Sequence, residues 1–157
     1  MSRVRIAAIG LLCLLCLTAI QAEEVASVAI VVHPSVEVSN LTMLQLRRIF
    51  LAEQQFWPDR SRITLLVRAP GAVERDIVLS QIYQMNDAQF RQYWIAKIFR
   101  AEVPSGPKIV LSSNMALELV TAIPGSITFI SASAVDEGTK VVRINGLLPS
   151  QAGYPLR

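Results

Sequence analysis

Short apolar runs alternate along the chain with segments whose apolar residues recur at helical spacing. The runs are rich in β-branched residues and predict strands over residues 25–32, 62–67, 109–111, 126–130 and 140–144. The intervening segments predict helices after Thr42, over 73–82, after Asn86, and from Ser112 or Ser113 to Ile123. This alternation predicts an α/β fold with a mainly parallel sheet flanked by helices, followed by a loose tail.

Two of the predicted helices begin with matching capping signals. Thr42 is followed three residues later by Gln45, and Asn86 is followed three residues later by Gln89. This spacing is typical of a capping box, in which the side chain of each residue accepts a hydrogen bond from the backbone N–H of the other. The two helix starts are therefore expected close to Thr42 and Asn86.

The helix after Asn86 carries three aromatic residues at the spacing of one helical face. Phe90, Tyr93 and Trp94 stand at positions i, i+3 and i+4. Such a stripe either packs into the core or stacks on a ligand, and its spacing favours packing into the core.

Residues 1–22 have the layout of a secretory signal peptide. Arg3 and Arg5 precede an apolar run over 6–17, and Ala22 ends a small-residue cleavage site before Glu23. The alternative is a membrane anchor, for which the apolar run is too short to span a bilayer comfortably. We therefore expect a signal peptide over 1–22 and one domain over 23–157, exported to the periplasm.

Removal of this segment changes both the cysteine content and the charge of the chain. Cys13 and Cys16, the two cysteines of the sequence, both lie inside it, so the exported protein would have no disulfide and no cysteine metal site. Without Arg3 and Arg5, Lys+Arg falls from 15 to 13 against 12 Asp+Glu, which gives a net charge near +1. This balance, with no long basic run, does not indicate nucleic-acid binding.

The sequence contains no recognisable catalytic constellation. His33, the only histidine, stands beside a proline at a strand end with no identifiable partner. There is no nucleophile elbow, no phosphate-binding P-loop, no dinucleotide fingerprint and no set of acids and histidines at metal-ligand spacing. We expect a protein that is not an enzyme and that binds no metal or cofactor.

The loop RAPGAVERD, residues 68–76, is the best candidate for binding chemistry. Arg68 ends a predicted strand, Gly71 allows a turn, and a predicted helix follows, so an arginine fork and backbone N–H groups could hold an oxyanion. The alternative is an ordinary strand–turn–helix junction. Glu74 and Asp76 fit that alternative, because acids in a first helical turn already satisfy the helix dipole and repel a phosphate. The local chemistry alone favours the junction.

Several segments in order resemble the periplasmic phosphate-binding proteins of ABC importers, in the type 2 periplasmic-binding-protein superfamily. The resemblance covers residues 27–131 and rests on Leu41-Thr42, Ile49-Phe50-Leu51, Trp57-Pro58-Asp59, the loop at Arg68, and Pro124-Gly125. It implies a periplasmic-binding-protein-like lobe with an α/β fold. Because the chain begins close to the family's crossover strand, it resembles the second lobe with a remnant of the first.

The resemblance also implies the residues of a ligand site. Arg68 and Gly71 match the family's loop, whereas Ala72, Val73 and Glu74 stand where the family has serine, glycine and threonine. The expected ligand-binding residues are therefore Arg68, Gly71, Ala72 and Val73, with two hydroxyl donors lost and one carboxylate gained.

Two hypotheses about function follow. The first is a periplasmic solute-binding-like protein that binds phosphate or a similar oxyanion for ABC-type transport or sensing. The second is a degenerate lobe that binds no solute and acts as a periplasmic protein-interaction module. Both are compatible with a periplasmic or inner-membrane protein partner, because a binding cleft cannot form from one lobe alone.

The signal peptide gives the first testable prediction. When the full chain is exported by a Gram-negative host, we expect the protein recovered from the periplasm to begin at Glu23, as measured by intact mass. A mass that retains residues 1–22 would favour the membrane anchor instead.

Overall fold

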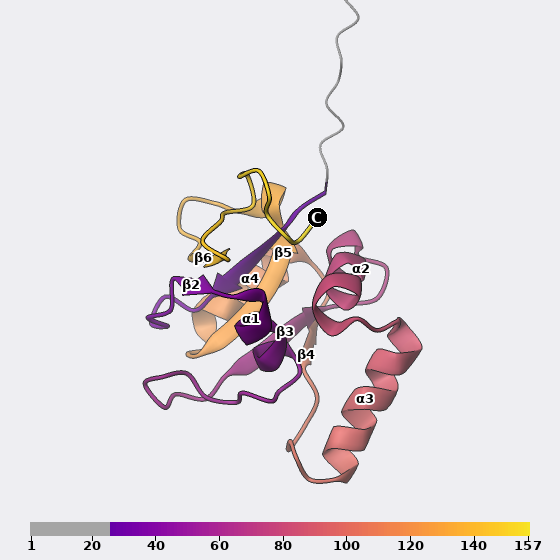
Figure 1. Cartoon of the computed structure of the whole chain (residues 1–157). Coiled ribbons are helices and arrows are strands. Elements are labelled where there is room, and N and C mark those ends of the chain that lie inside the picture. Colours follow the sequence, from indigo (N-terminus) through magenta and orange to yellow (C-terminus); the bar gives the residue numbers. More distant parts are fainter. Residues whose placement is uncertain (1–25) are drawn as a thin grey trace, which may run out of the picture.

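The fold is built on a single six-stranded sheet (Figure 1). The computed structural model describes residues 26–157, and the signal peptide predicted over 1–22 lies outside them. The strand order is β2-β6-β1-β5-β3-β4. The strands are β1 (Val28–Val32), β2 (Asn40–Leu41), β3 (Thr64–Arg68), β4 (Lys108–Val110), β5 (Ser126–Ser131) and β6 (Val141–Ile144).

Pairing in the sheet is mixed and mostly parallel. β2 with β6, β3 with β5, and β3 with β4 are parallel pairs. The central strand β1 is antiparallel to both of its neighbours, β5 and β6. The carboxyl ends of β3, β4, β5 and β6 consequently lie at one edge of the sheet, where β1 begins.

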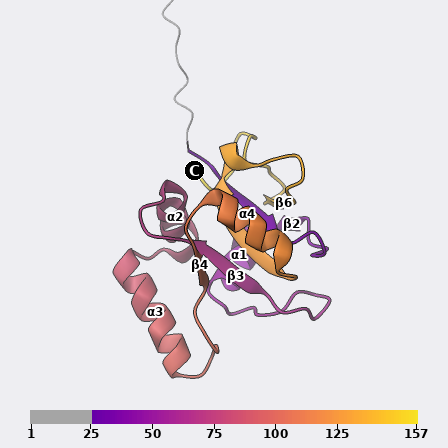
Figure 2. The same ribbon diagram turned by 180° about the vertical axis from the view of Figure 1, so that it is seen from behind.

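Helices lie on both faces of the sheet, and one, α3, extends away from it (Figures 1 and 2). The helical segments are α1 (Met43–Phe50), α2 (Val73–Val78), a π-helix (Leu79–Tyr83), α3 (Asp87–Phe99), α4 (Ser113–Ala122) and a 3-10 turn (Ala132–Ala134). One hydrophobic cluster joins the inward faces of α1, α2 and the π-helix to one side of the sheet. A smaller cluster joins α4 to the other side.

The alternation of side chains in β1 explains why both clusters form. Val28, Ile30 and Val32 belong to the larger cluster, and Ala29 and Val31 belong to the smaller one. Successive side chains of a strand point to opposite faces, so a run of five apolar residues is buried on both sides.

Helix α3 extends away from the sheet and is attached by the aromatic residues that the sequence placed in the core (Figure 1). Phe90 and Trp94 are buried in the larger cluster, which confirms the prediction of packing for them. Tyr93 packs against that cluster and donates a 2.6 Å hydrogen bond to the carbonyl of Leu51. Within residues 26–157, no helix is both long enough and apolar enough to cross a bilayer.

The predicted helix starts are confirmed, whereas the tail differs from expectation. Thr42 and Asn86 form complete capping boxes, and Ser112 caps α4. The tail after β6 is not loose: Tyr154 and Leu156 are buried, and Tyr154 donates a 2.7 Å hydrogen bond to the carbonyl of Val28. One aromatic and one aliphatic side chain are enough to hold this short segment against the core. Its residues show no regular periodicity, so a sequence pattern does not predict the contact.

Gly125 generates a prediction about stability. It has φ +75°, and a Cβ built there would lie 2.3 Å from the carbonyl oxygen of Arg62. We expect Gly125→Ala to lower the free energy of unfolding by at least about 2 kcal/mol, because it combines left-handed strain with a backbone clash. Gly146→Ala is the matched control, since Gly146 has φ +79° and nothing within 4 Å of its added Cβ. Equal losses for the two variants in urea titrations would contradict the role of the clash.

Candidate functional site

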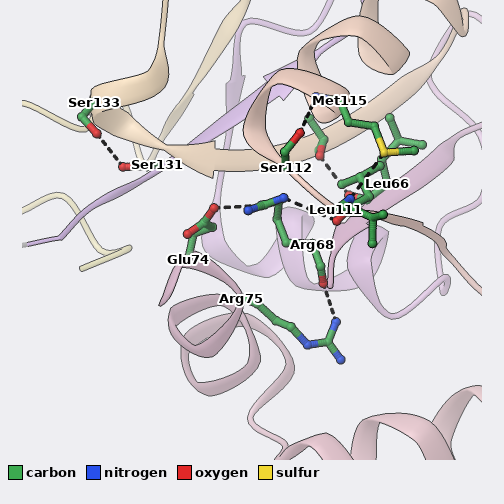
Figure 3. A network of polar contacts seen from close by, with 11 residues as sticks. Leu66, Arg68, Glu74, Arg75, Leu111, Ser112, Met115, Ser131 and Ser133 are labelled. Carbon is green, nitrogen blue, oxygen red and sulfur yellow. Dashed lines mark hydrogen bonds and ion pairs between the residues drawn. The ribbon is translucent and has the colours of Figure 1, made fainter. Parts of the chain in front are cut away.

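Arg68 ends β3 with its side chain almost fully enclosed. The residue is 9% exposed, and its Nε donates a 2.8 Å hydrogen bond to Glu74 Oε1 (Figure 3). Its Nη1 makes a longer contact of 3.5 Å with the carbonyl oxygen of Val110 on β4. The side chains of Arg68 and Glu74 are 11% and 13% exposed, so this ion pair is well shielded from water.

The turn after β3 places the other predicted site residues. Ala69 donates a 2.9 Å backbone hydrogen bond to Val110, which holds the start of the turn against β4. Gly71 has φ +91°, a conformation that favours glycine. Ala72 is the N-cap of α2 and offers no side-chain hydrogen bond, and Val73 follows as an exposed apolar residue. Gly71, Ala72 and Val73 can therefore contribute only backbone groups to a ligand.

Arg75 supports the site from beneath. It is 2% exposed, and its Nη1 donates a 2.8 Å hydrogen bond to the carbonyl oxygen of Arg68 (Figure 3). Its Nε and Nη2 donate to Asp87 Oδ1 at 3.2 and 2.7 Å, and its guanidinium lies 4.7 Å from the ring centre of Phe90. Arg75 thus ties the end of β3 to the first turn of α3, and its donors are used structurally.

Sequence reasoning missed Arg75, because nothing in the local pattern distinguishes it from an exposed helical arginine. Its carboxylate partner, Asp87, belongs to the next helix, and only the turn at residues 84–86 brings the two together. Sequence analysis did identify Glu74 as a carboxylate in the loop. The structure adds that this carboxylate forms an ion pair with Arg68.

The Arg68–Glu74 ion pair shows which kind of group the guanidinium of Arg68 can bind. A carboxylate oxygen and a phosphate oxygen are both anionic hydrogen-bond acceptors that suit a guanidinium. Glu74 therefore occupies the kind of position on Arg68 that an oxyanion would take. In the structure, the anion paired with Arg68 is supplied by the chain itself.

Two serines lie at the same edge of the sheet as Arg68. In the parallel register of β3 and β5, Leu65 is paired with Ile127. If the same register is continued by three residues, Arg68 is level with Ile130. Ser131 follows at the end of β5, and its hydroxyl lies 2.8 Å from that of Ser133. Figure 3 shows Glu74 on the side of Arg68 that faces these two serines.

The remaining candidate groups are not brought to this edge. His33 follows the carboxyl end of the antiparallel strand β1, at the opposite edge of the sheet, and its Nδ1 lies 2.7 Å from the hydroxyl of Ser35. Among residues 26–157, no group of three or more histidine, cysteine, aspartate or glutamate side chains is placed to hold a metal ion.

Comparison with solved structures shows which fold this is. The ABC-type phosphate transport receptor of Vibrio cholerae matches 80% of this chain and 48% of its own, at 21% identity and a TM-score of 0.63. PstS of Borrelia burgdorferi matches 83% of this chain and 54% of its own, at 17% identity and a TM-score of 0.66. The phosphate binding protein of Stenotrophomonas maltophilia matches 79% and 40%, at 14% identity and a TM-score of 0.57.

These matches show that the chain has the fold of phosphate ABC transporter substrate-binding proteins, as the resemblance implied. The chain spans about half the length of the solved proteins that it matches, which agrees with a single lobe. No family model matches the sequence. At these identities the likeness concerns the fold, and the roles of Arg68, Gly71, Ala72 and Val73 stay a proposal.

The position of Arg75 gives a prediction about the support of the site. We expect Arg75→Lys to lower the free energy of unfolding by about 2 kcal/mol, because an ammonium cannot reach both Asp87 and the carbonyl of Arg68. Arg91→Lys is the matched control on the exposed face of α3, and we expect almost no change for it. Urea titrations of both variants measure the difference, and equal stability would show that the charge alone is sufficient.

Proposed function

We propose that this chain is a periplasmic solute-binding protein that holds phosphate or a similar oxyanion at Arg68. The observation that carries the proposal is the nearly buried guanidinium of Arg68 with an anionic oxygen already 2.8 Å from its Nε. The solved proteins of the same fold, which are named for phosphate binding and phosphate transport, support the choice of ligand class. These neighbours are binding and transport proteins by name, which supports binding in place of catalysis.

In this proposal Glu74 and the ligand compete for one guanidinium. A hydrogen bond to a charged group contributes about 1.5–3 kcal/mol, and the ligand must replace the one that Glu74 makes. This exchange weakens binding by roughly 10- to 150-fold compared with an open arginine. The proposed site is therefore a weak or regulated one, suited to millimolar ligand or to a partner that draws Glu74 away.

A partner belongs to the proposal, because the described lobe provides one side of a ligand site. A second protein in the periplasm or inner membrane, or a second copy of the chain, would supply the other side. ABC-type transport and sensing are the two uses that fit a periplasmic binding lobe. Residues 23–157 would form the exported protein.

The alternative, a lobe that binds no solute and only docks on other proteins, is not favoured by these neighbours. It retains one structural argument: the Arg68–Glu74 pair satisfies both charges without any ligand. The two functions differ in what happens when the carboxylate is removed. A vacated guanidinium binds an anion in a solute site, whereas in a docking module the change affects stability alone.

Replacement of Glu74 gives the decisive prediction. We expect Glu74→Thr to tighten phosphate binding by about 10- to 100-fold, because it frees the guanidinium and restores a hydroxyl donor. Arg68→Ala, alone or with Glu74→Thr, should abolish binding. Calorimetric titration of phosphate into residues 23–157 measures all of these affinities.

Two controls make the result specific. Glu137→Thr removes an exposed glutamate that forms no ion pair within the described residues, and it should leave the affinity unchanged. Glu74→Gln removes the charge and keeps the length of the side chain, so it separates charge from shape. If wild type and Glu74→Thr show no saturable heat with phosphate or with any phosphate ester, the proposal is wrong and the docking module stands in its place.

A further inference from the structure

A large cavity lies beside the carboxyl end of β5, the strand next to β3, and extends to the first residue of β6. Its volume is about 590 Å³, within the range of ligand pockets. It is bounded by the residues before β1, the turn after β5, strand β6 and the segment that follows β6. The side chains that matter to its chemistry are those of Ser27, Ser131, Ser133, Val141, Leu148 and Ser150.

Arg68 and Glu74 do not themselves line the cavity, and the topology of the sheet is what links the two. β5 lies between β1 and β3, so Ser131 at its end faces the cavity from the strand next to Arg68. Neighbouring strands are about 4.8 Å apart, and this edge holds the carboxyl ends of β3, β5 and β6. Open α/β sheets bind ligands outside the carboxyl ends of their strands. In the view of Figure 3, Glu74 lies on the side of Arg68 toward Ser131 and Ser133.

The lining of the cavity differs sharply in chemistry from the Arg68 site. It contains no charged side chain: four serines provide hydroxyls, and the other residues are alanine, valine, leucine and proline. An inorganic oxyanion in such surroundings would lose hydration that a mostly apolar lining cannot replace. An uncharged organic group with apolar surface fits, and the serine hydroxyls can bond to one or two oxygens on it.

We propose that the ligand of the Arg68 site is an organic phosphate monoester and not inorganic phosphate. Its phosphate group lies at Arg68 in place of the Glu74 carboxylate, and its uncharged body fills the serine-lined cavity. This inference rests on the proposed function and names the ligand class of the same site. Burial of the body supplies affinity that inorganic phosphate lacks, which offsets the competition from Glu74.

The test compares three probes on the purified protein: inorganic phosphate, n-butyl phosphate and phenyl phosphate. Calorimetric titrations are made on wild type and on Glu74→Thr, so that a weak wild-type signal does not hide the comparison. We expect the two esters to bind at least about tenfold more tightly than phosphate, because each buried methylene adds to the affinity.

Filling the cavity locates the body of the ester. Ser150→Trp introduces a bulky side chain from an exposed position in the segment after β6 and should remove the advantage of the esters while leaving phosphate binding intact. Ser105→Trp is the matched control, since Ser105 is an exposed serine in the loop before β4, outside the cavity. A second measurement uses wild type and does not depend on whether Ser150→Trp folds. We expect the backbone amide NMR signals of Ser27 and Ser131 to shift with butyl phosphate and not with phosphate.

The outcomes separate this inference from the proposed function. Equal affinities for phosphate and the esters overturn the inference and leave oxyanion binding in place. An ester advantage that survives in Ser150→Trp, without shifts at Ser27 and Ser131, also overturns it, because the body would then lie elsewhere. No binding of any probe to wild type or Glu74→Thr overturns both.

Discussion

The antiparallel pairing of β1 with β5 is the constraint on which the rest of the structure depends. Five residue pairs, from Val28 with Ser131 to Val32 with Ile127, join the start of the described chain to a strand near its end. Both strands are buried on their two faces, so one ladder supplies side chains to both hydrophobic clusters. Because β1 runs against its neighbours, the chain enters at the edge where the other strands finish. The candidate site and the serine-lined cavity both lie at that edge.

Two buried arginines at this edge are satisfied in different ways. A buried guanidinium is tolerated only when anions and carbonyls satisfy its donors. Arg75 meets this requirement through Asp87 and the carbonyl of Arg68, both fixed by the packing of α2 and α3. Arg68 meets it mainly through Glu74, a residue of the first turn of α2. The guanidinium of Arg68 therefore depends on one carboxylate, whereas that of Arg75 is shared between a carboxylate and a backbone carbonyl.

The described residues correspond to part of a larger fold. In the fold that this chain shares with the phosphate-binding proteins, it spans about half of their length. Within these residues the guanidinium of Arg68 is nearly buried, and an internal carboxylate, that of Glu74, satisfies its charge. The cavity at the end of β5 is lined by no charged side chain, so no ion pair is needed to satisfy it.

The sequence by itself determined the class of fold, the helix starts at Thr42 and Asn86, and the strand–turn–helix junction at Arg68, because these depend on local periodicity and on side chains a few residues apart. It also indicated that the acids of the loop, Glu74 and Asp76, conflict with a phosphate. Only the tertiary structure decided that β1 is antiparallel, that the π-helix continues α2, that Tyr154 and Leu156 dock the tail, and that Arg75 reaches Asp87. Each of these depends on contacts between segments separated along the chain, and their geometry is set by packing that no local pattern encodes.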